Sequence, residues 1–476
     1  MILAIDQGTT GTTCLVVDES LRPIGRGYRA LEQHFPQPGW VEHDPDEIWA
    51  TVEGSAADAL ADAGVRPHEL SAIGITNQRE TTLVWQRRSG RPVDRAIVWQ
   101  DRRTAARCAQ LPADLIRERT GLVPDPYFSA TKLEWILGRT DIPQRELVFG
   151  TVDTWLVWKL TGGAAHITDV TNASRTMLLD LATGEWDDEL LEVFGVEQSV
   201  LPSIVGSSGI VAEASLLGAG VPIAGIAGDQ QAALFGQGCF APGEAKATYG
   251  TGTFVLVNLG ERLASVSNGV LGTAAAVAPA EPAQFAAEGA VLVGGAALQW
   301  LCDGLGVIAS AAESEALAAG LASTGGVFFV PALTGLGSPQ WDPNARGLIC
   351  GLTRGSTGAH LVRAALEAIA HQVADVLDVL PLEVGVLRAD GGATANGFLM
   401  QLQADLIGTP VEVSSEPETT ALGTAALAGL GVGVWESPTD VARLVRRGVT
   451  FEPRMDRSTA EAHREAWRRA LQRALI

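Results

Sequence analysis

Cysteine is scarce in this chain of 476 residues, and its few copies are widely scattered. The five cysteines stand at positions 14, 108, 239, 302 and 350, and no two of them form a C-x-x-C pair. An odd number of distant cysteines argues against a disulfide framework and against a zinc site built from thiolates. We therefore expect buried, reduced thiols and a cytoplasmic protein.

Three short motifs are also missing. The sequence contains no G-x-x-x-x-G-K-[ST], no G-x-G-x-x-G and no H-E-x-x-H. These absences remove the motif support for a P-loop nucleotide site, a Rossmann dinucleotide site and a zincin metal site. Any phosphate group that this chain binds must be held by another kind of loop.

Positive charge is in deficit, with 34 Lys and Arg against 55 Asp and Glu and a formal net charge of -21. Such a field repels polyanions, so we expect neither nucleic-acid binding nor membrane insertion. No basic region precedes the first apolar run, which predicts no signal peptide. The uncharged stretch 419–435 is rich in Gly and Ala and short for a membrane span, which favours a buried interdomain helix.

Residues 2–18 have the pattern of a phosphate-binding hairpin. Two apolar, β-prone runs flank a loop of glycine and threonine, whose backbone amides can face an anion. Asp6 ends the first run, and because a carboxylate repels phosphate, we expect it to hold Mg²⁺ or a Mg²⁺-bound water. An ordinary hairpin with a solvated turn is the alternative.

Residues 245–257 repeat this design of strand, Gly/Thr turn and strand. Two such hairpins about half a chain apart predict a duplicated α/β domain, with a phosphate chain held between the two loops. The length also fits two large domains, which we place at 1–240 and 241–476. A third strand and loop at 386–396 carries glycines that would let a flat ring lie against the backbone.

Two predicted buried strands, 70–76 and 221–228, end in polar residues. Arg79 and Glu80 follow the first strand, and Asp229 follows the second. Ligands of open α/β sheets lie beyond strand ends, and an Arg beside a Glu supplies the donors and acceptors that a polyhydroxyl ligand requires. A solvated ion pair is the alternative.

Two helical stretches of small residues predict a close crossing that works as a hinge. One follows Asp229 and the other covers residues 421–429. A last helix, with a capping box from Ser458 to Glu461 and Trp467 on its apolar face, is expected to pack on the second domain.

Together these features resemble the actin-like (ribonuclease H-like) ATPase fold, with an interdomain active-site cleft. Within that fold the chain resembles the FGGY carbohydrate kinases, and among them those that act on glycerol, over residues 2–432. The segments that carry the resemblance are Asp6-Gln7-Gly8-Thr9-Thr10, Gly39-Trp40-Val41-Glu42-His43-Asp44-Pro45, Ile75-Thr76-Asn77-Gln78-Arg79-Glu80-Thr81-Thr82, Tyr127-Phe128-Ser129-Ala130-Thr131-Lys132-Leu133-Glu134-Trp135, Gly228-Asp229-Gln230-Gln231 and Tyr249-Gly250-Thr251-Gly252.

The resemblance implies ATP- and Mg²⁺-dependent phosphorylation of glycerol to sn-glycerol 3-phosphate by a homodimer or homotetramer. The N-terminal domain would carry the polyol and phosphate side, and the C-terminal domain the nucleotide side. Glycerol would be hydrogen-bonded by Arg79, Glu80, Tyr127, Asp229 and Gln230, with Trp99 and Phe254 against its carbon edge. The phosphates would meet Thr9, Thr10, Gly11 and Thr251, and the rest of the nucleotide would meet Gly295, Gln299, Gly392 and Asn396.

Asp229 is the residue we assign as general base, because a primary hydroxyl is a poor nucleophile and needs a carboxylate within hydrogen-bonding reach to accept its proton. Asp6 would serve the Mg²⁺. The two domains would close over the reactants and exclude water.

Two departures from the family pattern stand out. Gly11-Thr12-Thr13 replaces the usual Ser-Ser-Arg, so a cation near the nucleotide is missing. Residues 213–220 contain no cation where relatives inhibited by fructose 1,6-bisphosphate carry a basic glycine loop, which predicts that this compound has no effect.

Three other functions stay open at the level of the sequence. The nearest is an FGGY kinase for another polyol or sugar, such as erythritol. An actin-like ATPase that switches or polymerises would share both hairpins but would not need the Arg79-Glu80 pair. A catalytically silent sensor is disfavoured because both proposed acids, Asp6 and Asp229, are present.

Overall fold

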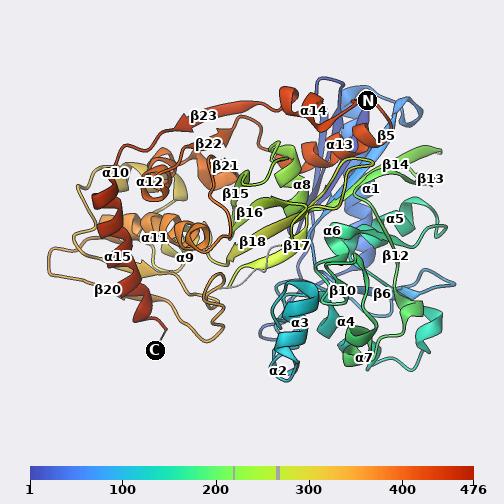
Figure 1. Cartoon of the computed structure of the whole chain (residues 1–476), viewed down its shortest axis with the longest axis horizontal. Coiled ribbons are helices and arrows are strands. Elements are labelled where there is room, and N and C mark those ends of the chain that lie inside the picture. Colours follow the sequence, from blue (N-terminus) through green and yellow to red (C-terminus); the bar gives the residue numbers. More distant parts are fainter. Residues whose placement is uncertain (218–219, 264–268, 476) are drawn as a thin grey trace.

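The computed structural model describes residues 1–217, 220–263 and 269–475, which form two lobes that each contain one large β-sheet (Figure 1). The sheet of the first lobe has the strand order β13-β14-β5-β1-β2-β3. The strands are β1 (Ile2–Gln7), β2 (Gly11–Val17), β3 (Pro23–Ala30), β5 (Ala72–Asn77), β13 (Ser208–Ala214) and β14 (Val221–Gly228). Strands β1, β2 and β3 are antiparallel neighbours, whereas β1, β5 and β14 run parallel.

The sheet of the second lobe has the order β17-β18-β16-β15-β21-β22-β23. Its strands are β15 (Ala245–Tyr249), β16 (Thr253–Gly260), β17 (Leu271–Ala274), β18 (Phe285–Val291), β21 (Leu387–Asp390), β22 (Val411–Ser414) and β23 (Arg447–Phe451). Strands β15, β16 and β18 are antiparallel neighbours, and β15, β21 and β22 run parallel. Both sheets therefore share one plan, an antiparallel hairpin with a third strand on one side and two parallel strands on the other. The predicted duplicated actin-like α/β fold is confirmed.

Helices cover both faces of the first sheet. Every second residue of β1 packs against α1 (Pro45–Ala63) and α5 (Val152–Leu160), and the residues between them face α13 (Thr419–Gly431). This alternation follows from the two-residue period of a strand. The start of helix α1 is capped, because the Asp44 side chain accepts a hydrogen bond from the Asp46 amide and Pro45 occupies the first turn.

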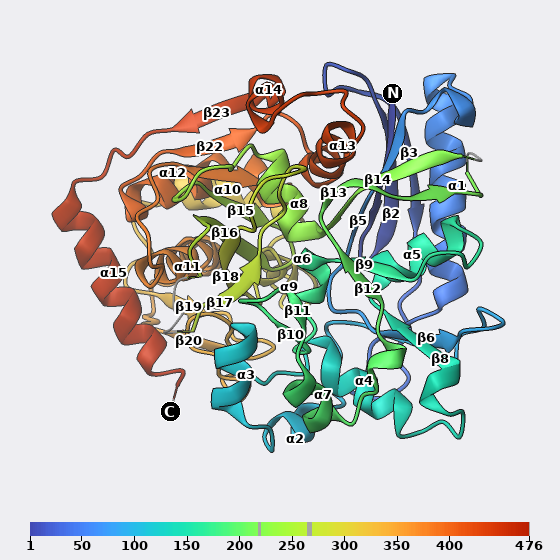
Figure 2. The ribbon, with the colours of Figure 1, turned by 45° about the vertical axis from the view of Figure 1, so that its right-hand side comes forward.

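The second sheet packs its main core against α9 (Ala296–Asp303), α11 (Gly358–Asp378) and α12 (Gly397–Ile407). Helix α15 (Arg457–Gln472) closes the outer side of this lobe and buries Trp467, as expected (Figure 2). The capping box predicted at Ser458 is wrong. Asp456 caps the helix instead, because its carboxylate accepts hydrogen bonds from the Thr459 amide and from the Ser458 and Thr459 hydroxyls.

Two helices cross between the lobes, and each packs against the sheet of the other lobe. Helix α8 (Asp229–Gly236) follows β14 of the first sheet and contacts β15 and β16 of the second, whereas α13 follows β22 of the second sheet and packs on β1, β5 and β14 of the first. They touch through backbone, since a Cβ on Gly423 would lie 1.9 Å from the Ala232 carbonyl oxygen and a Cβ on Gly236 would lie 2.1 Å from that of Thr419. The expected buried interdomain helix is α13.

Most of the remaining segments lie in the lower part of the first lobe or at the rim of the second, and α14 lies at the top of the molecule near α13 (Figure 2). They are β4 (Glu42–His43), β6 (Leu83–Gln86), β7 (Ala96–Ile97), α2 (Ala105–Cys108), α3 (Ala113–Thr120), α4 (Ser129–Leu137), β8 (Leu147–Gly150), β9 (Ile167–Asp169), α6 (Val170–Ala173), β10 (Leu179–Asp180), β11 (Glu185–Trp186), α7 (Asp188–Phe194), β12 (Ser203–Val205), α10 (Ser314–Ala319), β19 (Phe328–Val330), β20 (Leu348–Cys350) and α14 (Pro438–Leu444). Within the described ranges no helix has the length and apolar character needed to span a bilayer. Of the cation-free segment 213–220, positions 218 and 219 lie outside the described residues.

Candidate active site

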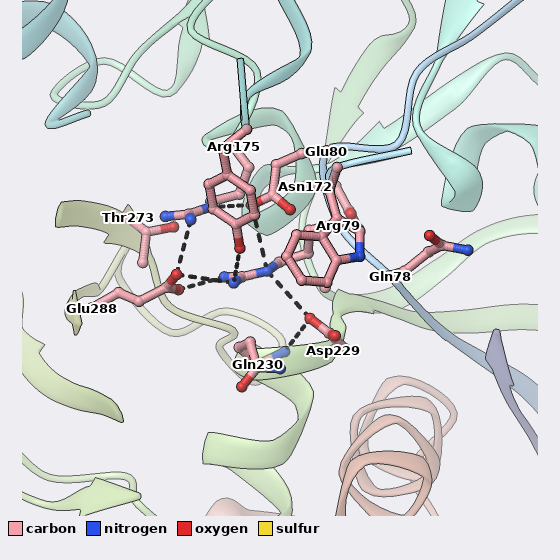
Figure 3. A network of polar contacts seen from close by, with 12 residues as sticks. Gln78, Arg79, Glu80, Asn172, Arg175, Asp229, Gln230, Thr273 and Glu288 are labelled. Carbon is pink, nitrogen blue, oxygen red and sulfur yellow. Dashed lines mark hydrogen bonds and ion pairs between the residues drawn. The ribbon is translucent and has the colours of Figure 1, made fainter. Parts of the chain in front are cut away.

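A buried polar network lies where β5 ends (Figure 3). Arg79 and Glu80 follow the last residue of β5, and their side chains are 2% and 1% exposed. The Arg79 guanidinium donates to both carboxylate oxygens of Glu288 on β18, at 2.5 and 3.0 Å. A bidentate pair of this kind fixes both orientation and spacing. Arg79 therefore links the end of the first sheet to the second sheet.

Arg175, which follows α6, completes this network (Figure 3). Its Nε donates to Glu80 at 2.7 Å and its Nη2 donates to Glu288 at 2.9 Å. The guanidinium also lies over the ring of Tyr127, 5.6 Å from the centroid. Glu80 itself has a positive φ of 60°, a conformation that few non-glycine residues adopt, so its carboxylate is held in place by the surrounding contacts.

Charge compensation sets the ionisation of this cluster. Burial alone would raise the pKa of Glu288, but the Arg175 and Arg79 guanidiniums outweigh it and bring the pKa to about 2. Burial raises the pKa of Glu80, and Arg79 and Arg175 only partly oppose that rise. Glu288 thus carries the fixed negative charge that two buried arginines require.

Asp229 is the carboxylate of the network that meets solvent. It is the first residue of α8, directly after β14, and its side chain is 31% exposed. Oδ1 lies 3.2 Å from Arg79 Nε and accepts the backbone N–H of Gln230 at 2.7 Å. The second oxygen, Oδ2, receives no hydrogen bond from the residues that the structure describes. Asp229 is therefore oriented on one side and open on the other.

Gln230 is held from the second sheet. Its Oε1 accepts a hydrogen bond from Lys246 Nζ on β15, and Lys246 also donates to Thr248 at 2.9 Å. Burial lowers the pKa of Lys246 to about 8, against the opposing pull of Asp390 and Asp229. With its carbonyl oxygen engaged by Lys246, Gln230 presents an amide NH₂ group as its remaining donor.

Three aromatic rings stand together beside the polar network. The Trp99 ring lies 5.5 Å from the Tyr127 ring and 6.2 Å from the Phe254 ring, both in edge-to-face geometry. Trp99 Nε1 donates to Thr9 Oγ1 at 2.9 Å, which joins this wall to the first hairpin loop. Tyr127 receives a long hydrogen bond of 3.4 Å from Arg79.

The two Gly/Thr loops have the expected form. The first connects β1 to β2, and the Gly8 amide donates to the Gly11 carbonyl at 2.9 Å. The second connects β15 to β16, where the Thr251 carbonyl accepts the amides of Gly294 and Ala296 at 2.8 and 3.1 Å. These bonds bring the start of α9 against the second loop. Gly295 has no room for a side chain there, since a Cβ would lie 2.9 Å from the Gly250 carbonyl oxygen.

A cavity of about 680 Å³ opens beside the second loop. It is lined mainly by apolar atoms and backbone of β15, α9, α10 and the loop after β21. Five residues predicted for the nucleotide line it together, namely Thr251, Gly295, Gln299, Gly392 and Asn396. Thr9, Thr10 and Gly11 do not line this cavity, since they belong to the hairpin of the other lobe.

Asp6 lies near the end of β1, and the surroundings of its carboxyl group suit a metal ligand. Burial raises the pKa of its carboxyl well above the ordinary value, and Asp229 and Glu418 raise it further. No residue in the described part of the chain donates a hydrogen bond to its side chain. A carboxylate that has no donor of its own and lies near other acidic groups is a ligand that a hard divalent cation such as Mg²⁺ can bind, so Asp6 fits that ion.

Family models match nearly the whole chain. Residues 1–236 match the N-terminal domain, and residues 245–432 the C-terminal domain, of the FGGY family of carbohydrate kinases. The chain belongs to the FGGY family. Over its full length this FGGY kinase is 52% identical to a glycerol kinase from Geobacter sp. (strain M21), with 98% of that relative covered. It is 50% identical to a glycerol kinase from Myxococcus xanthus, with 99% of each chain covered.

Solved structures agree with this membership. The structure of Plasmodium falciparum glycerol kinase with ADP superposes with a TM-score of 0.92 at 37% identity, covering 100% of this chain and 98% of the other. A xylulose kinase from Rhodospirillum rubrum superposes with a TM-score of 0.86 at 25% identity, covering 99% and 98%. Over nearly its whole length this FGGY kinase therefore has the same fold and the same arrangement of its two lobes as these two kinases.

Four residues of the FGGY site escaped prediction from sequence: Arg175, Gln231, Lys246 and Glu288. Gln231 accepts from Arg79 at 3.1 Å and directly follows the predicted pair, so its place in the motif was a usable signal. Glu288 and Lys246 give a clearer signal, because each is a single charged residue within an apolar strand. A buried charge of this kind requires a partner. Arg175 follows a short helix and shows no local pattern.

Proposed function

We propose that this FGGY kinase transfers the γ-phosphoryl group of ATP to glycerol and forms sn-glycerol 3-phosphate. The observation that carries the proposal is Asp229, whose carboxylate is held by Arg79 through Oδ1 and has Oδ2 open (Figure 3). Full-length relatives at 50% identity and above that bear the name glycerol kinase support the choice of acceptor.

In this proposal glycerol lies between the polar network and the aromatic wall. Arg79 and Glu80 bind two of its hydroxyls, Tyr127 and the free amide of Gln230 add further hydrogen bonds, and the rings of Trp99 and Phe254 cover its carbon edge. Ion pairs between the two arginines and the two buried glutamates already hold the network in place without a ligand, so little ordering is needed when glycerol binds. Preorganisation of this kind favours a small, rigidly oriented acceptor.

Asp229 then accepts the proton of the primary hydroxyl as that oxygen attacks the γ-phosphorus. The terminal phosphorus–oxygen bond of ATP breaks, ADP leaves, and the proton stays on the Asp229 carboxyl until solvent removes it. Arg79 Nε, 3.2 Å from Oδ1, keeps the carboxylate aimed at the hydroxyl. A general base in this position is expected to contribute on the order of 10²–10⁴-fold in rate.

The phosphate chain would run between the two hairpins, with Thr9, Thr10 and Gly11 on one side and Thr251 on the other. The adenosine would occupy the cavity of about 680 Å³ next to Gly295, Gln299, Gly392 and Asn396. Asp6 would hold Mg²⁺, which supplies neutralisation of phosphate charge when bound. The five cysteines are free, which supports the expected cytoplasmic location.

Identification of the product tests the proposal. The chain is incubated with Mg-ATP and glycerol, and the product is assayed with a dehydrogenase that oxidises only the sn-3 enantiomer of glycerol phosphate. We expect one mole of the sn-3 product per mole of ADP. Formation of ADP with no sn-glycerol 3-phosphate would refute the assignment, and preferential phosphorylation of erythritol would transfer the mechanism to another acceptor.

A further inference from the structure

Helices α11 and α15 meet at three potential metal ligands on the outer side of the second lobe. Glu367 and His371 belong to α11, and His463 belongs to α15. One oxygen of Glu367 and one ring nitrogen of each histidine lie within 4.8 Å of one another. Figures 1 and 2 both show α15 running along the outside of α11. None of the three residues lines the cavity assigned to the nucleotide.

The helical repeat explains why the three side chains converge. Glu367 and His371 are four residues apart and so lie on one face of α11. On α15, His463 and Trp467 have the same spacing, and the Trp467 indole stacks on the His371 ring with 5.2 Å between centroids and 3° between planes. This stacking fixes the His371 ring and brings His463 opposite it.

His371 and Glu367 are buried, yet each has a side-chain nitrogen or oxygen without a hydrogen-bond partner in the part of the chain that the structure describes. His371 is 1% exposed and its Nδ1 is buried, yet neither ring nitrogen has a hydrogen-bond partner among the residues described. Glu367 is 5% exposed and accepts from Arg363 Nε at 2.8 Å through Oε1 alone, leaving Oε2 unbonded within the described ranges. Because an unpartnered buried polar group is costly, the buried Nδ1 of His371 calls for a partner.

The charges around the cluster are balanced. Arg464 pairs with Asp375 at 2.8 Å and with Asp378 at 2.5 Å, and Arg468 pairs with Asp378 at 3.0 Å. Arg363 binds Oε1 of Glu367 and leaves Oε2 available. An outer group that orients a metal ligand acts in this way.

We propose that Glu367, His371 and His463 bind one borderline transition-metal ion, Zn²⁺ before others, which ties the C-terminal helix to the core of the second lobe. Two imidazoles and one carboxylate form a donor set that suits Zn²⁺ rather than Mg²⁺. His463 is only half-buried, so a water molecule can complete a tetrahedral site from the solvent side. The role is structural, separate from the Mg²⁺ at Asp6.

Zinc binding to the intact chain tests this proposal. The purified protein is stripped with a chelator and titrated with Zn²⁺ by calorimetry in excess Mg²⁺, which occupies the carboxylates of the catalytic cleft. We expect one Zn²⁺ per chain and a raised melting temperature. His463→Ala is expected to weaken binding by at least about tenfold and to abolish the thermal shift, while zinc-free kcat stays unchanged.

Two controls keep the outcome decisive. His68→Ala removes an exposed histidine of the first lobe and must bind Zn²⁺ like the wild type. His463→Gln keeps the side-chain size if the alanine variant fails to fold. Co²⁺ absorbance in the visible range should appear in the wild type and vanish in both His463 variants. A wild type that takes up no stoichiometric Zn²⁺, or a His463 variant that binds it unchanged, would overturn the site.

Discussion

Asp229 differs from the other carboxylates around Arg79 by its exposure, which is 31% against 1% for Glu80 and 0% for Glu288. The two buried acids pair with arginines, whereas the carboxylate of Asp229 is partly exposed and is the one that we propose as general base. Asp229→Asn keeps the shape and removes the proton acceptor, so kcat should fall on the order of 10²–10⁴-fold with little change in the free energy of unfolding. Steady-state kinetics and urea unfolding check this. Asp188→Asn, at an exposed helix start, is the matched control and should leave kcat unchanged.

Glu288 gives a prediction about stability and pH. Its pKa of about 2 in the folded chain lies below its ordinary value of 4.5, because two arginines outweigh the effect of burial. A depressed acid contributes stability that is fully present above the unfolded pKa and is lost as pH falls through the folded pKa. The contribution should therefore disappear between about pH 4.5 and pH 2.

Glu288→Gln is expected to destabilise the folded chain at neutral pH by about 3–5 kcal/mol, because it leaves two buried arginines without their shared carboxylate. The difference in unfolding free energy between wild type and variant should shrink as the pH falls through that window. Urea unfolding at several pH values measures it, with the exposed Glu185→Gln as control. A difference independent of pH would mean that Glu288 is not an ionised partner of Arg79 and Arg175.

At this scale the sequence predicted the residues that follow strand ends, Arg79, Glu80 and Asp229, because a strand end is a local pattern. It could not predict their partners. Arg79 meets Glu288 across 209 positions, and Glu80 meets Arg175 across 95. The first pair depends on how the two lobes meet and the second on the tertiary packing within the first lobe, and no local periodicity encodes either.

At the level of elements, α8 and α13 cross with their backbones in close contact. The runs of small residues predicted that the helices would lie close. They did not predict that each helix would pack on the sheet of the other lobe, because the same residues would suit a crossing within one lobe. The crossing of α8 and α13 joins the two sheets through a close contact of their backbones, as we expect of a hinge.

Gly423→Ala tests that contact. The added Cβ would lie 1.9 Å from the Ala232 carbonyl oxygen, so the helices must separate. We expect a loss of about 1–3 kcal/mol in the free energy of unfolding. Gly54→Ala in α1 is the matched control. Its added Cβ would meet only the flexible Arg29 side chain, at 3.0 Å or more. This substitution should stabilise the chain by about 0.5–1 kcal/mol. Equal effects of the two substitutions would contradict the close crossing.

For the whole molecule, two Gly/Thr hairpins half a chain apart were sufficient to predict a duplicated fold. The structure adds the strand order, in which each hairpin is flanked on one side by two parallel strands. The capping of the last helix was assigned to Ser458 instead of Asp456, because both positions carry residues that favour a helix start. Local errors of this size do not alter the architecture.

Acceptor-dependent release of ADP tests the central claim most directly. ADP formation from Mg-ATP is measured without acceptor and then with glycerol, erythritol, xylulose or gluconate, in the wild type and in Asp229→Asn. The account predicts strong stimulation by glycerol, weak or no stimulation by the other compounds, and loss of the glycerol response in the variant. ADP release at the same rate with and without every acceptor would contradict it, because the chain would then be an ATPase and not a glycerol kinase.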